Sequence, residues 1–372
     1  MRALLLAAAA IAASCTAASA APEELRARVS PAPAALATRM WSPAIRLTDR
    51  GRPASARLSL TVRKGTVRRT FRPRASRRGS YRARVVFPSD GRWSWSLAAA
   101  KRTLARGAIS VSTRVTFDLP YDLAVTPGGT ILFLDRSRVL ALDPGGRVRV
   151  HARTPSRELI GMERLADGTL FVTDFPGNRI LRIDPSGRVT PVAQVEAPAD
   201  LVSDDSGTTL WVASIADGVG VLRVDVASGR VEPFADPENP HGIDRDASGD
   251  FYVHDGHAVS RLDGETRALT PFANVDAFKQ LVAPDGSVYG VEGTPAGGRV
   301  LRIAQDGSVS PVAGTGTLTP NRDGPALEVG TLPSAVALAD DGAVLFTQTQ
   351  PVAAVRRVDP VSGRVTTLAR GR

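Results

Sequence analysis

One phrase recurs six times between residue 120 and the end of this chain, and it restricts the fold more than any other feature. Its clearest copy is residues 170–189, Leu-Phe-Val-Thr-Asp-Phe-Pro-Gly-Asn-Arg-Ile-Leu-Arg-Ile-Asp-Pro-Ser-Gly-Arg-Val. Every copy has a glycine turn followed by a run rich in β-branched and aromatic residues. The turn glycines are Gly129, Gly168, Gly207, Gly249, Gly286 and Gly342. Short apolar runs separated by turns of Gly, Asp and Ser predict antiparallel strands in a meander.

The spacing of the copies predicts how these strands are grouped. Asp143, Asp184 and Asp225 lie 41 residues apart, and each period holds four short strand-like runs. Four strands in a period of about 40 residues are typical of a propeller blade. We therefore predict an all-β chain in which residues 114–372 form a six-bladed β-propeller.

Two stretches resemble the NHL-repeat family of β-propellers. One is residues 174–180, Asp-Phe-Pro-Gly-Asn-Arg-Ile, and the other is the long segment 313–336 that ends in a proline before an inner strand. The resemblance covers roughly residues 115–372 and implies a propeller related to gluconolactonase-like and virginiamycin B lyase-like proteins. Such propellers include lyases, lactonase relatives and binding scaffolds, so the resemblance implies the fold and no single activity. Residues 115–117 and 365–368 are both candidates for the outer strand that closes the ring.

The N-terminus has the pattern of a secretory signal peptide. Met1-Arg2 precedes an apolar stretch from Ala3 to Ala13, and Ala18-Ser19-Ala20 is a suitable cleavage site. We predict a signal peptide over residues 1–20 and a secreted, periplasmic or cell-surface protein. Cys15, the only cysteine, would then be removed; a lipoprotein anchor on Cys15 is the alternative. No other apolar run is long enough to span a bilayer, so we expect no transmembrane segment in the mature chain.

Residues 22–113 do not match the repeat. Their alternating runs, such as 56–62 and 81–87, predict strands with one exposed face, and we predict an immunoglobulin-like β-sandwich. This segment carries 19 Arg and 2 Lys against 4 acidic residues, whereas residues 114–372 carry 25 basic and 33 acidic residues. The chain is therefore strongly basic in its first part and acidic in its second.

The densest basic cluster lies in the middle of the N-terminal segment, and it consists of Arg68, Arg69, Arg72, Arg74, Arg77 and Arg78. Three interpretations remain open: a polyanion patch for an anionic envelope polymer, solvated arginines on an open sheet, or docking against the acidic propeller. No aromatic series alternates with the arginines, so we expect no nucleic acid partner.

Candidate site residues in the propeller are those that depart from the repeat. Glycine is usual at the start of the inner strand in the NHL family, but Asp122, Asp200 and Lys279 occupy that position in three copies. Glu292 ends a second strand at the same rim. We predict that these four residues line a binding site near the central channel.

The fourth repeat contains three of the four histidines. His241, Asp255 and His257 are the candidate catalytic residues, because a histidine beside a carboxylate can act as a general base. Asp122, Asp200 and His241 are the candidate ligands of a divalent cation such as calcium. Two hypotheses follow: a binding or scaffold module for a protein, peptide or glycan partner, and a metal-assisted lactone hydrolase or lyase.

Overall fold

The structure is a computed structural model that describes residues 24–30, 35–36, 40–89, 91–111, 115–319 and 322–371. The predicted signal peptide and Cys15 lie outside these residues. The chain divides into two compact units, residues 1–114 and 115–372. Both units are built from β-strands, and the only helical turns described are η1 (Phe175–Gly177) and η2 (Ala326–Glu328). No helix in the described part of the chain has the length and apolar character needed to cross a membrane.

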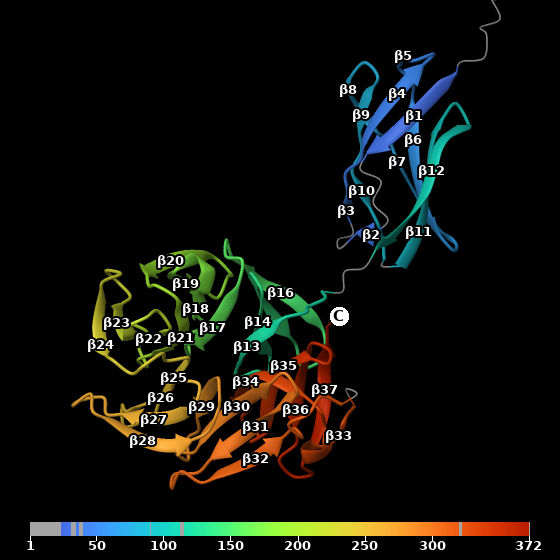
Figure 1. Cartoon of the computed structure of the whole chain (residues 1–372). Helices are drawn as coiled ribbons and strands as arrows, with labels where there is room; N and C mark the ends of the chain where they lie inside the picture. Colours follow the sequence, from blue (N-terminus) through green and yellow to red (C-terminus); the bar gives the residue numbers. More distant parts are fainter. Residues whose placement is uncertain are drawn as a thin grey trace, which may run out of the picture. The chain divides into compact units, whose positions relative to one another are not determined.

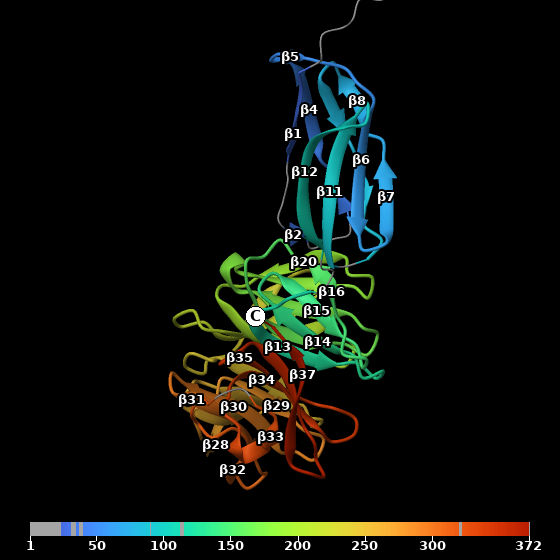
Figure 2. The ribbon, with the colours of Figure 1, turned by 90° about the vertical axis from the view of Figure 1, so that its right-hand side faces the viewer.

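The N-terminal unit contains two main sheets. One follows the order β1-β4-β9-β8, with β5 paired to β4, and the other follows the order β2-β12-β11-β6-β7. A small third sheet pairs β10 with β3. Figure 2 shows the long strands β12, β11, β6 and β7 side by side. The strands are β1 (Leu25–Ser30), β2 (Ala35–Leu36), β3 (Met40–Trp41), β4 (Ala44–Asp49), β5 (Arg52–Pro53), β6 (Leu58–Lys64), β7 (Val67–Phe71), β8 (Arg74–Arg77), β9 (Ser80–Arg82), β10 (Val85–Val86), β11 (Gly91–Ala99) and β12 (Arg102–Val111).

One hydrophobic core holds the N-terminal sheets together. Residues alternate between buried and exposed along β4, β6 and β11, as expected for strands with one face on the core. Three tryptophans lie in this core: Trp41, Trp93 and Trp95. Gly107 on β12 leaves the space that Trp95 occupies, because a Cβ atom there would lie 2.7 Å from the indole Nε1.

The second unit is a β-propeller of consecutive antiparallel sheets. Figure 1 shows the sheets arranged in a ring, and each inner strand lies beside the inner strands of the adjacent sheets. The first three sheets comprise β13 (Pro120–Val125), β14 (Ile131–Asp135), β15 (Arg138–Leu142) and β16 (Val148–Arg153); β17 (Leu159–Arg164), β18 (Leu170–Asp174), β19 (Arg179–Ile183) and β20 (Val189–Gln194); and β21 (Pro198–Ser203), β22 (Thr209–Ser214), β23 (Gly220–Asp225) and β24 (Val231–Ala235).

Further sheets follow along the chain. They comprise β25 (Gly242–Arg245), β26 (Phe251–His254), β27 (Ala258–Leu262) and β28 (Leu269–Asn274); β29 (Lys279–Val282), β30 (Val288–Thr294), β31 (Gly297–Ile303) and β32 (Val309–Ala313); and β34 (Leu332–Leu338), β35 (Val344–Gln350), β36 (Ala354–Val358) and β37 (Arg364–Arg370), with β33 (Gly324–Pro325) paired to β37. The second strands β14 and β18 are buried along their whole length, which fits the apolar residues that fill most of each strand.

The repeated aspartates stabilise turns. Asp184 accepts hydrogen bonds from the backbone N–H groups of Ser186 and Arg188, and Gly187 adopts a φ of +86°. An aspartate that caps a turn and a glycine with positive φ are the usual means of closing such a hairpin. The motif at residues 174–180 is also structural, since Asp174 caps η1 and Asn178 ends it in the left-handed conformation.

The ring closes without a shared sheet. Residues 365–368 lie in β37, the outermost long strand of the last sheet, whereas residues 115–117 are not in a strand, so the expectation that they could form an outer strand is wrong. Side chains join the last sheet to the first: the Ser334 hydroxyl donates to the Pro120 carbonyl, and the Thr347 hydroxyl donates to that of Tyr121. Phe117 packs in the cluster that these two sheets share.

Candidate functional site

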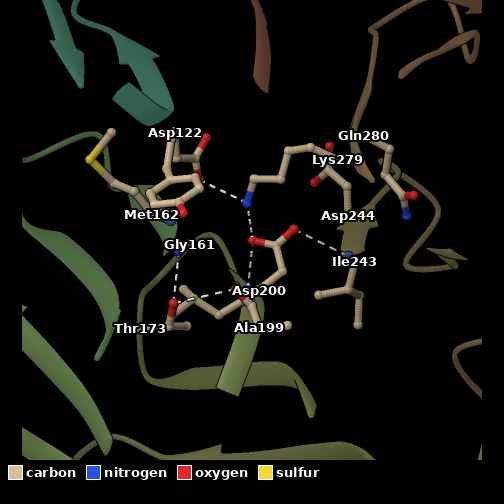
Figure 3. Close-up of polar contacts among 12 residues, drawn as sticks. Asp122, Gly161, Met162, Thr173, Ala199, Asp200, Ile243, Asp244, Lys279 and Gln280 are labelled. Carbon is tan, nitrogen blue, oxygen red and sulfur yellow. Dashed lines mark hydrogen bonds and ion pairs between the residues drawn. The ribbon is translucent and has the colours of Figure 1, made fainter. Parts of the chain in front are cut away.

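A buried ion-pair cluster lies among the inner strands. Lys279 begins β29, and its ammonium group contacts Asp122 Oδ2 at 2.8 Å and also Asp200 Oδ1. The three side chains are between 3% and 13% exposed. Figure 3 shows the lysine reaching between the two carboxylates. The structure therefore brings together the three residues that depart from the repeat at the start of the inner strand, although they come from three different sheets.

Backbone donors fix the carboxylate of Asp122. Oδ1 accepts from the N–H of Leu123 at 2.8 Å, and Oδ2 accepts from the N–H of Met162, in the next inner strand, at 2.7 Å. This aspartate thus connects the first sheet to the second.

Asp200 has the same arrangement two sheets further round the ring. Its Oδ1 accepts from Leu201 N–H at 2.9 Å, and its Oδ2 accepts from Ile243 N–H at 3.3 Å in the fourth sheet. Gly161 occupies the corresponding position in the second sheet, where its N–H donates to the Thr173 hydroxyl instead. The two aspartates of the cluster therefore hold neighbouring inner strands together.

The electrostatics of the cluster favour a charged lysine. Burial alone would lower the pKa of Lys279, but Asp122 and Asp200 raise it above its usual value. Burial raises the pKa of Asp200 to about 6, against the opposing attraction of Lys279. The cation that neutralises these carboxylates is thus supplied by the chain itself.

The calcium expectation finds no support in this geometry. Asp122 and Asp200 point their oxygens at Lys279 and at backbone N–H groups, which leaves them poorly placed to coordinate an ion. Within the part of the chain that the structure describes, no three His, Cys, Asp or Glu side chains are grouped so as to hold a metal. Calcium requires six to eight oxygen ligands.

A cup of about 760 Å³ opens on one side of the cluster, and Lys279 lines it. Its wall is mainly apolar and includes Phe278, which is 46% exposed. The lining residues are Tyr121, Glu158, Ile160, Phe175, Ala199, Ile215, His241, Phe278, Lys279, Gly293, Thr294, Pro295, Leu332, Pro333, Ser334, Thr349 and Gln350. Burial and a hydrogen bond with Glu158 raise the pKa of Tyr121 to about 12, so both groups are engaged with each other.

The three candidate catalytic residues are not joined into one network. His241 lines the cup and contacts Asn239 Nδ2 at 3.1 Å. Asp255 accepts from the backbone N–H groups of His257 and Ala258 and so caps a turn. The His257 imidazole is largely exposed and lies 3.3 Å from Asp276. Among the described contacts, none is a hydrogen bond between His241 and Asp255.

Glu292 has a partner of its own, and His241 is uncharged. Glu292 accepts from Arg299 Nη1 at 2.8 Å, across the β30–β31 pair. Partial burial lowers the pKa of His241, with Asp255 acting in the opposite direction, so its imidazole is neutral at neutral pH. His241 is therefore a neutral hydrogen-bonding group in the wall of the cup.

A second cavity, of about 330 Å³, lies on the other side of the cluster and is lined by Lys279 as well. It contains two acids that the sequence interpretation missed, Glu163 and Asp244. Burial raises the pKa of Glu163 to about 8 and that of Asp244 to about 7. The charge of Asp244 also raises the pKa of Glu163, and the charge of Asp200 raises both. Both residues lie five positions before a turn glycine, where the other copies have apolar residues, and this departure is the signal that could have revealed them.

The residues of the predicted arginine cluster are divided between two sheets. Arg68 and Arg69 belong to β7 in the five-stranded sheet that contains β11, whereas Arg74 and Arg77 belong to β8 in the opposite sheet. Arg72 lies in the connection between these two strands, and Arg78 follows β8. Proximity in sequence is therefore a poor guide to which arginines share a face.

The arrangement of the sheets defines the class: a β-propeller preceded in the chain by a separate β unit. No family model and no curated protein matches the sequence.

Solved structures with a similar fold include a streptogramin B lyase, with 16% identity and a TM-score of 0.51 over 68% of this chain and 84% of that one. A gluconolactonase from Xanthomonas campestris has 18% identity and a TM-score of 0.52 over 63% and 84%. A protein of unknown function from Bacteroides thetaiotaomicron has 11% identity and a TM-score of 0.50 over 92% and 86%. At such identities these similarities establish the fold alone.

Proposed function

We propose that this chain is an exported binding protein, with an immunoglobulin-like N-terminal domain and a six-bladed NHL-type propeller, and that the 760 Å³ cup receives part of a peptide or protein partner. The cup itself is the observation that carries the proposal. Binding sites are typically concave, between about 300 and 1,000 Å³, and mostly apolar with a few polar groups. The cup fits this description, and Lys279 is among the few polar groups that line it.

The chemistry of the lining favours an apolar side chain flanked by peptide groups. Phe278, Phe175 and Leu332 supply apolar surface, while Ser334 and neutral His241 supply hydrogen-bonding groups that suit an amide. A partly exposed Phe278 has apolar area still in contact with water, and a ligand that covers it gains from burying that area. An apolar residue of a partner is thus the best occupant.

The test is a binding screen of the full chain against an array of short peptides, followed by measurement of affinity for the best peptide. Covering the exposed part of a phenylalanine is worth about 1–1.5 kcal/mol, so Phe278→Ala should weaken binding about tenfold. Leu269→Ala is the matched control, because Leu269 is 41% exposed but does not line the cup. Equal affinity of both variants, or no peptide selected for apolar residues, would contradict the proposal.

A lactone hydrolase or lyase is the alternative, and His241 is the group that favours it, because a neutral imidazole in a cup can accept a proton. The purified chain should be assayed against a series of lactones with and without added calcium or zinc. Turnover that disappears in His241→Ala but persists in His257→Ala would replace the binding proposal with this one.

A further inference from the structure

A cavity of about 570 Å³ lies on the outer face of the N-terminal sheet β2-β12-β11-β6-β7. It is well separated in sequence from the propeller cup. Three arginines line it: Arg63 on β6, Arg68 on β7 and Arg106 on β12. The strand register explains why they meet. Arg63 is directly opposite Arg68, and Arg106 is opposite Ser96 on the intervening strand β11.

The floor between the arginines is formed by hydroxyl side chains. Thr61, Ser94 and Ser96 line the cavity, and they alternate along their strands with core residues such as Leu60 and Trp95. They therefore face outward, as period-two alternation requires. The Ser94 hydroxyl donates to the Arg63 carbonyl at 3.2 Å. Cationic groups thus surround a hydrogen-bonding surface.

The positive charge that lines this cavity has no acidic partner among the described residues of its sheet. Like charges placed directly opposite each other on neighbouring strands are destabilising, and Arg63 and Arg68 are such a pair. Within the described part of the N-terminal unit the acidic residues are Glu24 and Asp49, and neither belongs to this sheet. A bound anion would supply the compensating charge.

We propose that this cavity is a binding site for an acidic sugar unit of an anionic polysaccharide, with Arg63, Arg68 and Arg106 contacting its sulfate, phosphate or carboxylate groups. Guanidinium groups form strong, often bidentate hydrogen bonds with such oxyanions. The hydroxyl floor can bond to the sugar hydroxyls. This site is independent of the function proposed for the propeller.

The lining distinguishes this ligand from other polyanions. Single-stranded nucleic acids are held by aromatic side chains on which bases stack, but the one aromatic residue lining the cavity, Trp95, is 7% exposed. A lipid surface would be expected to meet apolar side chains beside the arginines, whereas the lining here is hydroxylic and cationic. The polysaccharide fits both the charge and the floor.

The experiment measures binding of the full chain to dextran sulfate by calorimetry at several salt concentrations, with uncharged dextran, oligothymidine and phosphatidylglycerol-containing vesicles as comparison probes. The test variant is Arg63→Ala/Arg106→Ala. The matched control is Arg28→Ala/Arg46→Ala, which removes the same charge from an exposed cross-strand pair on the other main sheet. All four side chains are exposed, so both variants should fold, and circular dichroism verifies this.

We expect the test variant to bind dextran sulfate about tenfold more weakly, with a smaller dependence on salt, since two charge contacts are lost. The control variant should stay within about twofold of the unchanged chain. Equal weakening of both variants would show a general effect of positive charge and would overturn the site. Tighter binding of oligothymidine or of the vesicles than of dextran sulfate would overturn the choice of ligand.

Discussion

Replacement of Lys279 by methionine tests the role of the ion-pair cluster in the propeller. Methionine keeps the length and apolar stem of the side chain, so the main change is the loss of the ammonium group. Asp122 and Asp200 would then face each other at 5% and 3% side-chain exposure with no cation between them. Both are held in place by backbone N–H groups and cannot easily turn away.

The size of the effect follows from the burial. Removing one partner of a buried ion pair costs about 3–5 kcal/mol, because an uncompensated charge remains in a poorly solvated place. For a domain of this size each kcal/mol lowers the melting temperature by about 2–4 °C. We therefore expect Lys279→Met to lower the melting temperature of the propeller by about 10 °C at pH 7.5.

Calorimetry at two pH values separates this cause from a simple packing defect. Burial and the charge of Asp122 raise the pKa of Asp200, and without Lys279 no cation opposes these two effects. Protonation as the pH falls then favours the folded state, so the deficit should shrink between pH 7.5 and pH 5. Arg182→Met, at an exposed position of β19, is the control for removing a positive charge. A loss no larger than that of Arg182→Met, or a deficit that does not change with pH, would refute the reasoning.

Two further changes test the acidic cavity and the N-terminal core. The pKa of Glu163 is raised by burial to about 8, well above its unfolded value, so ionisation should destabilise the propeller as the pH rises from 5 to 9. Because the Glu163 side chain is only half-buried, we expect Glu163→Gln to stabilise the propeller by only about 1 kcal/mol at pH 9. In urea unfolding, the free energy of unfolding of this variant should also depend less on pH. An unchanged pH dependence would contradict this reasoning. Gly107→Ala should cost the N-terminal unit about 1–3 kcal/mol and shift its tryptophan fluorescence, since the new Cβ would displace Trp95. Gly128→Ala, with open space around the site, should be neutral in the same measurements.

The strand pattern of the propeller could be predicted from the sequence because turn chemistry and apolar periodicity are local. Gly187 and Asp184 perform in the structure the roles that their types imply. The departure of Asp122, Asp200 and Lys279 from the repeat also marked residues that meet in space. Their mutual pairing was not predicted, since a repeat alignment gives the height of a residue along the channel but not the reach of its side chain.

The missed residues share a physical cause. The pKa values of Glu163 and Asp244 are raised by burial and by nearby carboxylates, which depend on packing between sheets and not on any motif. The arginine site had a similar origin, because Arg63, Arg68 and Arg106 are brought together by strand pairing over more than forty residues of sequence. The arginines that are close together in the sequence are therefore not the same residues as the arginines that strand pairing brings together.

The manner in which the ring closes has a mechanical consequence. Each sheet of the propeller comes from one contiguous stretch of chain, and the first and last sheets meet through side chains, with Gly371 packed closely against the Phe117 carbonyl. Force applied to the two ends of the propeller would therefore load that junction without engaging any backbone ladder shared between the two sheets. The ring should therefore open first between the first and last sheets, while the strands within each sheet are still paired. By the same token, a permuted chain that joined residue 371 to residue 115 and began between β16 and β17 would keep every strand pair.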